Sequence, residues 1–247
     1  MIPSCLVLVK NEEYFLTYVL KQTEGYFENY VIYDVGSTDN TPQIIDHFYE
    51  RNKHKADIII RKLPHCEPDV QGTFRNAMIP EGKQSVYLIL DGDELYSPGA
   101  MQKMQGAATE LEALHTVNPE KRYGVVSRVE VTEDLTLKYI EKRGHHRLYT
   151  SDAYWTGTHP GERAGYKQEE KSELIFEGIT CLHMHNTWRS PRESDAVKRL
   201  WRKAQKSYHP GNVLGDLDLL AEYPALREPI EHFKVSPALK KLQEKIK

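Results

Sequence analysis

The stretch with the clearest chemical potential is the apolar run that begins at Tyr87 and ends in Asp91, Gly92, Asp93 and Glu94. A parallel strand is apolar because both of its faces are covered, and ligands gather where such strands end. Two aspartates separated by one residue at that edge suit a divalent cation such as Mg²⁺ or Mn²⁺, whose open positions a diphosphate can fill. The alternative is an acidic turn in which Gly92 supplies a positive φ and water solvates the carboxylates.

Two histidines later in the chain could complete such a metal site. His183 and His185 lie two residues apart in a run that is typical of a strand, so both side chains project to one face. Imidazole is an acceptable ligand for Mn²⁺. His185 is the first choice because it lies nearer the strand end, and His183 is the second. The alternative is that one histidine fills the core and the other binds a loop.

Strands and helices alternate along the first half of the chain. Strands are predicted at 4–9, 30–33, 56–60 and 86–90, and helices at 11–23, from Pro42 onward and around 74–78. Asn11 is expected to cap the first helix. This alternation predicts a parallel sheet with right-handed crossovers, and therefore an α/β fold. The Gly-x-Gly-x-x-Gly pattern of a dinucleotide-binding domain is absent after the first strand, which argues against an NAD enzyme.

The second half of the chain is predicted to extend the same domain and to cover its first half. Its predicted elements are a helix at 101–114, strands at 123–131, 137–139, 146–149 and 174–185, a basic helix at 194–208 and short proline-broken helices from 216 to 247. No internal repeat or low-complexity linker separates the two halves. The second half is therefore expected to be an elaboration and not an independent module.

Composition and charge exclude several classes of protein. The chain has 247 residues, of which 39% are hydrophobic and 28% charged, as suits one soluble α/β domain with some elaboration. A net charge of -3 provides no cationic field for nucleic acid or anionic lipid. Cys5, Cys66 and Cys181 are odd in number and are expected to be reduced thiols. No signal peptide or membrane span is evident, so we expect a cytoplasmic protein.

Four short motifs resemble, in order and spacing, those of family 2 glycosyltransferases. They lie at residues 8–13, 34–39, 75–76 and 90–94. The resemblance implies a GT-A type, Rossmann-like, mostly parallel sheet flanked by helices, with a C-terminal helical extension. It covers about residues 1–190, which would divide into a nucleotide-binding half at 1–95 and an acceptor half at 96–190. Residues 191–247 would form the extension, packed on the same domain.

The same resemblance assigns residues to the nucleotide. The carboxylate of Asp34 would accept a bond from the ring N–H of the base, which favours uracil and so a UDP-sugar, whereas the alternative is a cap for the following turn. Val9, at the end of the first strand, would also contact the nucleotide. Arg75 would border the base and phosphates, or else be a solvated helix charge. Arg147 would face the diphosphate.

Among the acids of the motif, Asp93 is the expected metal ligand. Asp91 would then hold the ribose or a metal-bound water, and Glu94 could support these residues from behind. We expect Asp93 to be an exposed carboxylate at the sheet edge. A late histidine that completes the metal site is known in several GT-A enzymes, which supports His185 or His183.

The polar and aromatic loop at 154–163 is the expected acceptor site, because the face of Trp155 could stack on a sugar. Related enzymes often have Gly-x-x-His-Glu here, whereas this chain has His159, Pro160, Gly161 and Glu162. Glu162 is the first candidate for the catalytic base and His159 the second.

The resemblance implies a metal-dependent transfer of a hexose, with glucose favoured, from a UDP-sugar to a hydroxyl group on a saccharide, lipid or protein glycan, with inversion. Mn²⁺ or Mg²⁺ would be the cofactor, and no nucleic acid is expected as a partner. Two alternatives remain open from the sequence. One is a nucleotidyltransferase, which also uses paired aspartates. The other is a non-catalytic domain that binds nucleotide-sugars.

Overall fold

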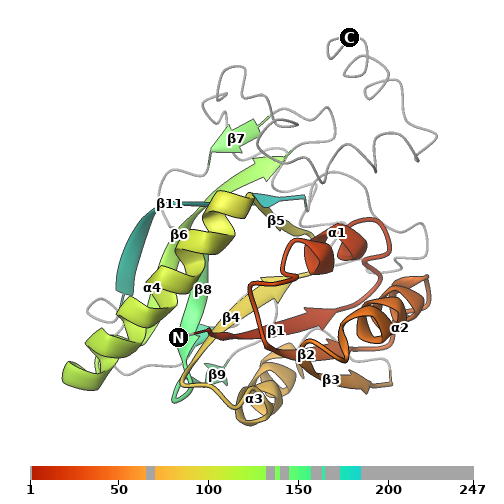
Figure 1. The fold of residues 1–247 in the computed structure, drawn as a ribbon, viewed down its shortest axis with the longest axis horizontal. Coiled ribbons are helices and arrows are strands. Elements are labelled where there is room, and N and C mark those ends of the chain that lie inside the picture. Colours follow the sequence, from red (N-terminus) through yellow and green to blue (C-terminus); the bar gives the residue numbers. More distant parts are fainter. Residues whose placement is uncertain are drawn as a thin grey trace.

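A computed structural model of the chain describes residues 2–64, 70–131, 137–139, 145–156, 163–164 and 173–184. Within these residues a nine-stranded sheet carries helices on both faces (Figure 1). The order of its strands is β3-β2-β1-β4-β8-β6-β11-β5, and β7 pairs with β6. The predicted α/β class is confirmed.

The first half of the chain builds the parallel part of this sheet. Its four strands are β1 (Ser4–Val9), β2 (Asn29–Asp34), β3 (Asp57–Lys62) and β4 (Val86–Asp91). They run side by side in one direction (Figure 1). In β1, Cys5 and Val7 face one side of the sheet while Leu6 and Leu8 face the other, and all four are buried. Two covered faces explain why β1, β2 and β4 are mostly apolar runs, whereas β3, at the edge of the sheet, is only partly buried.

The second half of the chain adds strands of both directions to the same sheet. They are β5 (Glu94–Tyr96), β6 (Tyr123–Val131), β7 (Leu137–Tyr139), β8 (His145–Thr150) and β11 (Glu173–His183). Strand β8 is antiparallel to both β4 and β6, whereas β11 is parallel to β6 and antiparallel to β5. The short strands β9 (Trp155–Thr156) and β10 (Arg163–Ala164) form a separate antiparallel pair. One continuous sheet thus joins the two halves.

Four helices cover the faces of the sheet: α1 (Leu16–Lys21), α2 (Thr41–Asn52), α3 (Gln71–Glu81) and α4 (Pro98–Val117). Apolar side chains of α1, α2 and α4 share one buried cluster with the sheet. Side chains of α3 share the cluster on the opposite face, together with Trp155 of β9. Helix α4 begins at a regular cap, because the hydroxyl of Ser97 accepts the N–H of Ala100 at 3.1 Å.

Two local predictions were wrong. Helix α1 begins at Leu16, and Asn11 does not cap it. Instead Asn11 has a φ of 56°, a left-handed conformation that asparagine tolerates better than most residues. The sequence analysis also missed β5, which starts at Glu94, the last residue of the acidic motif.

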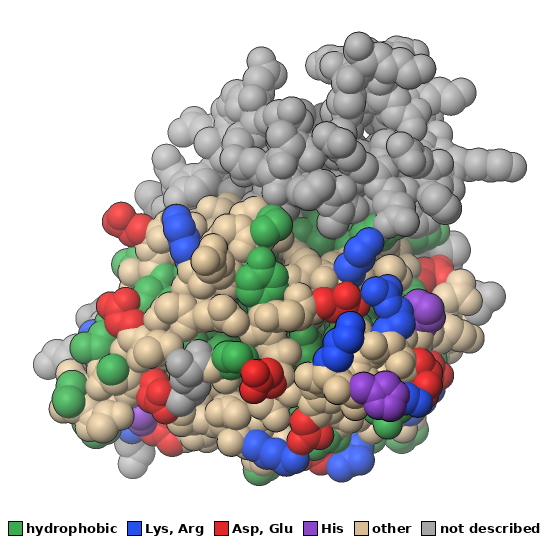
Figure 2. Space-filling view, in the orientation of Figure 1, with side chains coloured by type: hydrophobic (Ala, Val, Ile, Leu, Met, Phe, Trp, Pro, Cys, Tyr) green, Lys and Arg blue, Asp and Glu red, His purple; other side chains and the backbone are tan. Residues whose placement is uncertain are grey.

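The face shown in Figure 2 carries no single dominant charge. Acidic and basic side chains are interspersed on the face shown in Figure 2, which agrees with the small net charge. Cys5 and Cys181 are buried free thiols, as expected, and Cys66 lies outside the described residues. Within the described ranges, none of the helices has both the length and the apolar character needed to cross a bilayer.

Candidate active site

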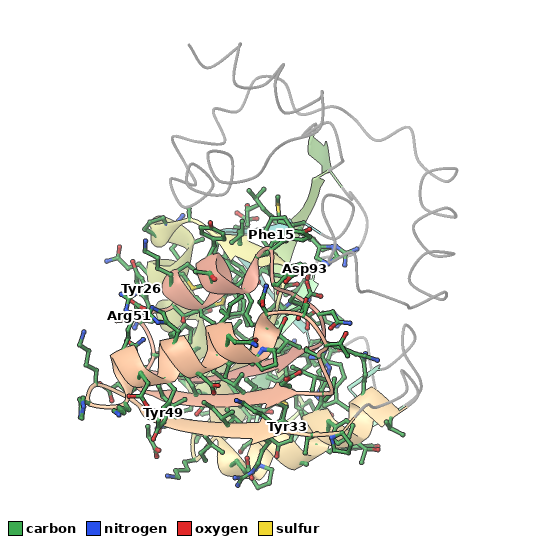
Figure 3. All side chains as sticks on the ribbon, turned by 90° about the vertical axis from the view of Figure 1, so that its right-hand side faces the viewer. Phe15, Tyr26, Tyr33, Tyr49, Arg51 and Asp93 are labelled. Carbon is green, nitrogen blue, oxygen red and sulfur yellow. The ribbon has the colours of Figure 1, made fainter. Side chains whose placement is uncertain are left out.

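The first strand brings the predicted nucleotide residues to one edge of the sheet. In the register of β1, Val9 pairs with Asp34 of β2 on one side, and Leu8 pairs with Asp91 of β4 on the other. Parallel strands end at the same edge, so the carboxylates that follow two separate apolar runs come together there. Figure 3 shows Asp93 at this end of the sheet and Tyr49 at the opposite end.

The loops after β1 and β2 are joined by hydrogen bonds that hold this edge in place. The side-chain oxygen of Asn11 accepts the N–H of Thr38 at 2.8 Å, and the N–H of Asn11 donates to the hydroxyl of Ser37 at 2.8 Å. The N–H of Glu12 donates to the hydroxyl of Thr41, also at 2.8 Å. The segment that follows β1 and the segment that follows β2 therefore form one hydrogen-bonded unit, although in the sequence they look like two independent turns.

Asp34 is buried, with 3% of its surface exposed. One carboxylate oxygen accepts the N–H of Ser37 at 3.0 Å. A carboxylate can accept several hydrogen bonds, so the second oxygen keeps capacity for a donor on a ligand. Asp34 therefore combines the turn-capping role of the alternative interpretation with a position suited to ligand binding.

Gly92 is required by packing and not by backbone conformation. Its φ is not positive, contrary to the solvated-turn alternative. A Cβ at this position would lie 2.7 Å from Cγ of Glu12 and 2.9 Å from Cγ1 of Val9. The acidic motif thus passes so close to the end of β1 that no side chain fits between its two aspartates without movement.

Two arginines hold the carboxylate of Asp91. Arg75 of α3 donates to Oδ1 at 3.0 Å, and Arg147 of β8 donates to Oδ2 at 2.7 Å. Burial by itself raises the pKa of Asp91, but the charges of Arg147 and Arg75 outweigh this and hold the pKa below its usual range. Asp91 is therefore an ionised anchor with an arginine on each oxygen, and its proposed contact with a ribose or a metal-bound water stays a prediction.

Glu94 lies fully buried behind Asp91 and shares Arg147 with it. Burial raises the pKa of Glu94 to about 7, although the charge of Arg147 opposes this shift. Burial acts in the opposite sense on Arg147, but the charges of Glu94 and Asp91 raise its pKa well above the usual value. Glu94 thus supports the motif from behind, in the position that the sequence analysis considered for it.

Asp93 faces a histidine. Oδ1 of Asp93 lies 3.6 Å from Nε2 of His183 in β11, and the carbonyl of Asp93 accepts the N–H of Met184 at 2.8 Å. Asp93 is only 4% exposed, so the prediction of an exposed edge carboxylate was wrong. Asp93 is buried because β5, which follows it directly, pairs with the end of β11 and so places Asp93 beside His183. His183, the second choice in the sequence analysis, therefore lies beside the expected metal ligand.

Sequence reasoning missed the role of Asn76, which follows Arg75 on α3. Its side-chain amide donates to the carbonyl of Trp155 at 2.9 Å and accepts the N–H of Trp155 at 2.6 Å. Trp155 is 8% exposed, and the centroid of its ring lies 4.8 Å from Cζ of Arg75. Trp155 is therefore largely buried against Arg75, and the expectation that its face stacks on a sugar was wrong.

Three predicted site residues lie outside the described residues. These are the two candidates for the catalytic base, Glu162 and His159, and the first-choice metal ligand, His185. Within the described parts of the chain, no group of three or more His, Cys, Asp or Glu side chains is arranged to hold a metal ion. The described residues thus offer a pair of donors, Asp93 and His183, and any third must come from elsewhere.

Solved structures of glycosyltransferases resemble this fold. Staphylococcus aureus TarS 1–349 in complex with UDP-GlcNAc is 16% identical with a TM-score of 0.51, and the match covers 96% of this chain and 69% of that one. Mannosyltransferase PcManGT from Pyrobaculum calidifontis, in complex with GDP-Man and Mn²⁺, is 15% identical with a TM-score of 0.50 over 97% of this chain and 67% of that one. GalNAc-T7 with UDP, GalNAc and Mn²⁺ is 9% identical with a TM-score of 0.55, and the match covers 77% of this chain and 44% of that one.

At these identities the likeness establishes the fold, which is of the GT-A type as predicted. In another structure of TarS 1–349 the match covers 61% of that chain, so this chain spans less than two thirds of some proteins that it resembles. A direct comparison with curated proteins gives no match. The sequence matches the family described as glycosyl transferase family 2 over residues 4–171. Because this match spans well over half of the 247 residues, the chain belongs to glycosyl transferase family 2.

Proposed function

We propose that the chain is a metal-dependent glycosyltransferase that moves a hexose from a UDP-sugar to a hydroxyl acceptor. One observation carries the proposal: β1 pairs with Asp34 through Val9 and with Asp91 through Leu8, and Asp93 follows at the same edge. Family membership supports the reaction type. The similar structures hold UDP-GlcNAc, GDP-Man, or UDP and GalNAc, so their sugars differ. UDP-glucose is the first donor to test in a panel of nucleotide-sugars.

The described residues suit the donor in two ways. The second carboxylate oxygen of Asp34 can accept a ring N–H, which uracil offers and which makes UDP the favoured nucleotide. Val9 lies beside Asp34 in the register and provides an apolar wall. Arg75 and Arg147 add two positive charges near the place proposed for the diphosphate, although both are engaged with Asp91.

The donor set of Asp93 and His183 fits a divalent cation, because a carboxylate oxygen and an imidazole nitrogen are both ligands that Mn²⁺ accepts. Asp93 and His183 would hold the ion, with His185 as a further candidate. When bound, the ion would neutralise charge on the departing diphosphate. Asp91 is less suited to direct ligation because each of its oxygens already accepts a bond from an arginine.

The acceptor hydroxyl must lose a proton as it attacks, so a base must lie within hydrogen-bond reach of it. Glu162 is the proposed base and His159 the alternative, and inversion would follow from a single in-line displacement. General-base catalysis is worth about 10²- to 10⁴-fold, so Glu162→Gln should lower turnover by that order while UDP affinity is kept. Normal turnover in both Glu162→Gln and His159→Ala would place the base elsewhere, and a product that retains the donor's configuration would exclude inversion.

Calorimetric titration with UDP, with and without Mn²⁺, tests the proposal. Wild type should bind UDP tightly only when Mn²⁺ is present, and Asp93→Asn should lose this dependence because it keeps the shape of the side chain and removes its charge. Asp57→Asn is the matched control, since Asp57 is the first residue of β3, at the end of the sheet opposite to the site, where it pairs with Lys83. Circular dichroism would confirm that both variants fold. Equal UDP affinity in wild type and Asp93→Asn would contradict the proposal.

A further inference from the structure

An unusual pair of hydrogen bonds fixes the backbone of Trp155 to helix α3. The amide of Asn76 both donates to and accepts from Trp155, at 2.9 and 2.6 Å. This is the pattern that a neighbouring β-strand would offer, supplied here by one side chain. Aspartate lacks the donor, and glutamine places its amide one methylene further from the helix, so only asparagine supplies this geometry.

The ring of Trp155 in turn covers the guanidinium of Arg75, with 4.8 Å between the ring centroid and Cζ. Behind it the ring packs on Tyr149, at 5.0 Å between centroids, and Tyr149 stacks on Tyr87 at 5.7 Å with an interplanar angle of 15°. These rings are buried in the core cluster on the α3 face of the sheet. Trp155 is therefore a rigid support whose position is set by both its backbone and its neighbours.

Arginine gains from such a support because its side chain has many rotamers and its planar head can use face and edge at once. The face packs on the ring as a cation–π contact, while the N–H groups on the edge stay available to acceptors. In Arg75 one edge group donates to Asp91 at 3.0 Å. The support thus orients Arg75 without occupying the groups that bind.

We propose that Asn76 and Trp155 are positioning residues that hold the Arg75 guanidinium in place at the nucleotide end of β4. This inference rests on the proposed function, in which that end binds a UDP-sugar. It links the donor side of the site, on α3 and β4, to β9, which directly precedes the candidate bases in the sequence. Neither Asn76 nor Trp155 need touch the substrate to affect it.

The first test measures UDP affinity in the presence of Mn²⁺. Trp155→Leu should weaken binding by roughly 2- to 30-fold, the range of a cation–π contact, and Trp155→Phe should restore most of the loss because it keeps an aromatic face. Asn76→Asp should weaken binding as well, since a carboxylate would face the carbonyl of Trp155. Tyr49→Leu is the control, because Tyr49 is an exposed aromatic residue on α2, far from Asp93.

A double-variant cycle separates positioning from general destabilisation. If Trp155 acts through Arg75, then Trp155→Leu should weaken UDP binding in wild type but not further in an Arg75→Lys background. Losses that add in full, or UDP affinity that is unchanged in Trp155→Leu, would overturn the inference.

A spectroscopic signature decides the inference even without UDP. The ring current of Trp155 should shift the NMR signal of the Arg75 Nε–H, which is identified by its absence in Arg75→Lys. That signal should move in Trp155→Leu and Asn76→Asp and stay in place in Tyr49→Leu, whereas an unmoved signal in Trp155→Leu would refute the contact. Wild type that fails to bind UDP while the signal behaves as expected would refute the proposed function alone.

Discussion

The two aspartates of the acidic motif have different neighbours, and this divides their roles. Asp91 accepts bonds from Arg75 and Arg147, so its charge is balanced inside the protein. Asp93 lies beside His183, so it and the imidazole together offer a donor pair to a cation. The residue types alone do not distinguish the two aspartates, because the distinction comes from β5 and β8, which bring different partners to each.

His183 should contribute to metal affinity because it lies within 3.6 Å of Asp93. His183→Ala is expected to weaken Mn²⁺ binding by about the 10- to 100-fold that loss of support around a metal site costs. His115→Ala is a close control, since His115 also lies 3.6 Å from an aspartate, Asp152, away from the site. Titration with Mn²⁺ would measure both variants. If only His185→Ala weakens the binding of Mn²⁺, His183 is a core residue and His185 is the ligand, as first predicted.

Glu94 should make the free energy of unfolding fall as the pH rises from about 4.5 to about 7. Its pKa is raised from 4.5 to about 7 in the folded protein, so the folded state keeps a proton that the unfolded state has released. The loss across this range is of order 3 kcal/mol. Glu94→Gln should remove this part of the pH dependence, as measured by urea unfolding between pH 4 and 8.

The exposed residue Glu50, changed to glutamine, is the control for that measurement. Arg147 keeps Asp91 as a partner in Glu94→Gln, so the variant should still fold. Parallel stability curves for wild type and Glu94→Gln over the whole range would contradict the prediction.

At the scale of elements, the sequence predicts the strands well and the contacts between helices and loops poorly. The runs at β1, β2 and β4 are recognisable because short, continuous apolar stretches between polar residues are typical of strands with two covered faces. Strand β5 was missed because three residues directly after a turn have no pattern of their own. Asn11 was assigned to a helix cap because two acids follow it, but its partner Thr38 lies in a different loop.

The same distinction applies to the candidate site. The carboxylates could be predicted because each ends a strand, and the parallel sheet determines that strand ends meet. The partners of Asp91 could not be predicted as a pair, because one comes from a helix and the other from a strand distant in sequence. The support of Arg75 by Trp155 likewise depends on how β9 packs against α3.

The close approach of the acidic motif to the end of β1 gives a prediction for two glycines. Gly92→Ala should destabilise the protein by about 1–3 kcal/mol, because the new methyl group would overlap Glu12 and Val9. Gly106→Ala, in helix α4, has open space around it and should stabilise the protein by roughly 0.5–1 kcal/mol. Urea unfolding would measure both changes, and similar values for the two variants would show that the contact at Gly92 relaxes freely.

At the scale of the whole molecule, both halves of the described chain share one core. Ile32 of β2 and Leu182 of β11 are buried in the same apolar cluster. Ile32→Ala and Leu182→Ala should therefore each cost about 2–5 kcal/mol and lower the midpoint of the same cooperative transition. Thermal unfolding followed by near- and far-UV circular dichroism would test this. Two transitions, each sensitive to only one of the variants, would show that the halves unfold separately.

The packing of Gly92 also constrains how this family can vary. Residues 9, 12 and 92 compete for one small volume, although the last is far from the others in sequence. A lineage could replace the glycine with a larger residue only after Val9 or Glu12 had become smaller. Residue sizes at these three positions should therefore change together among relatives, and a side chain between the two aspartates should occur with a reduced one at the end of the first strand.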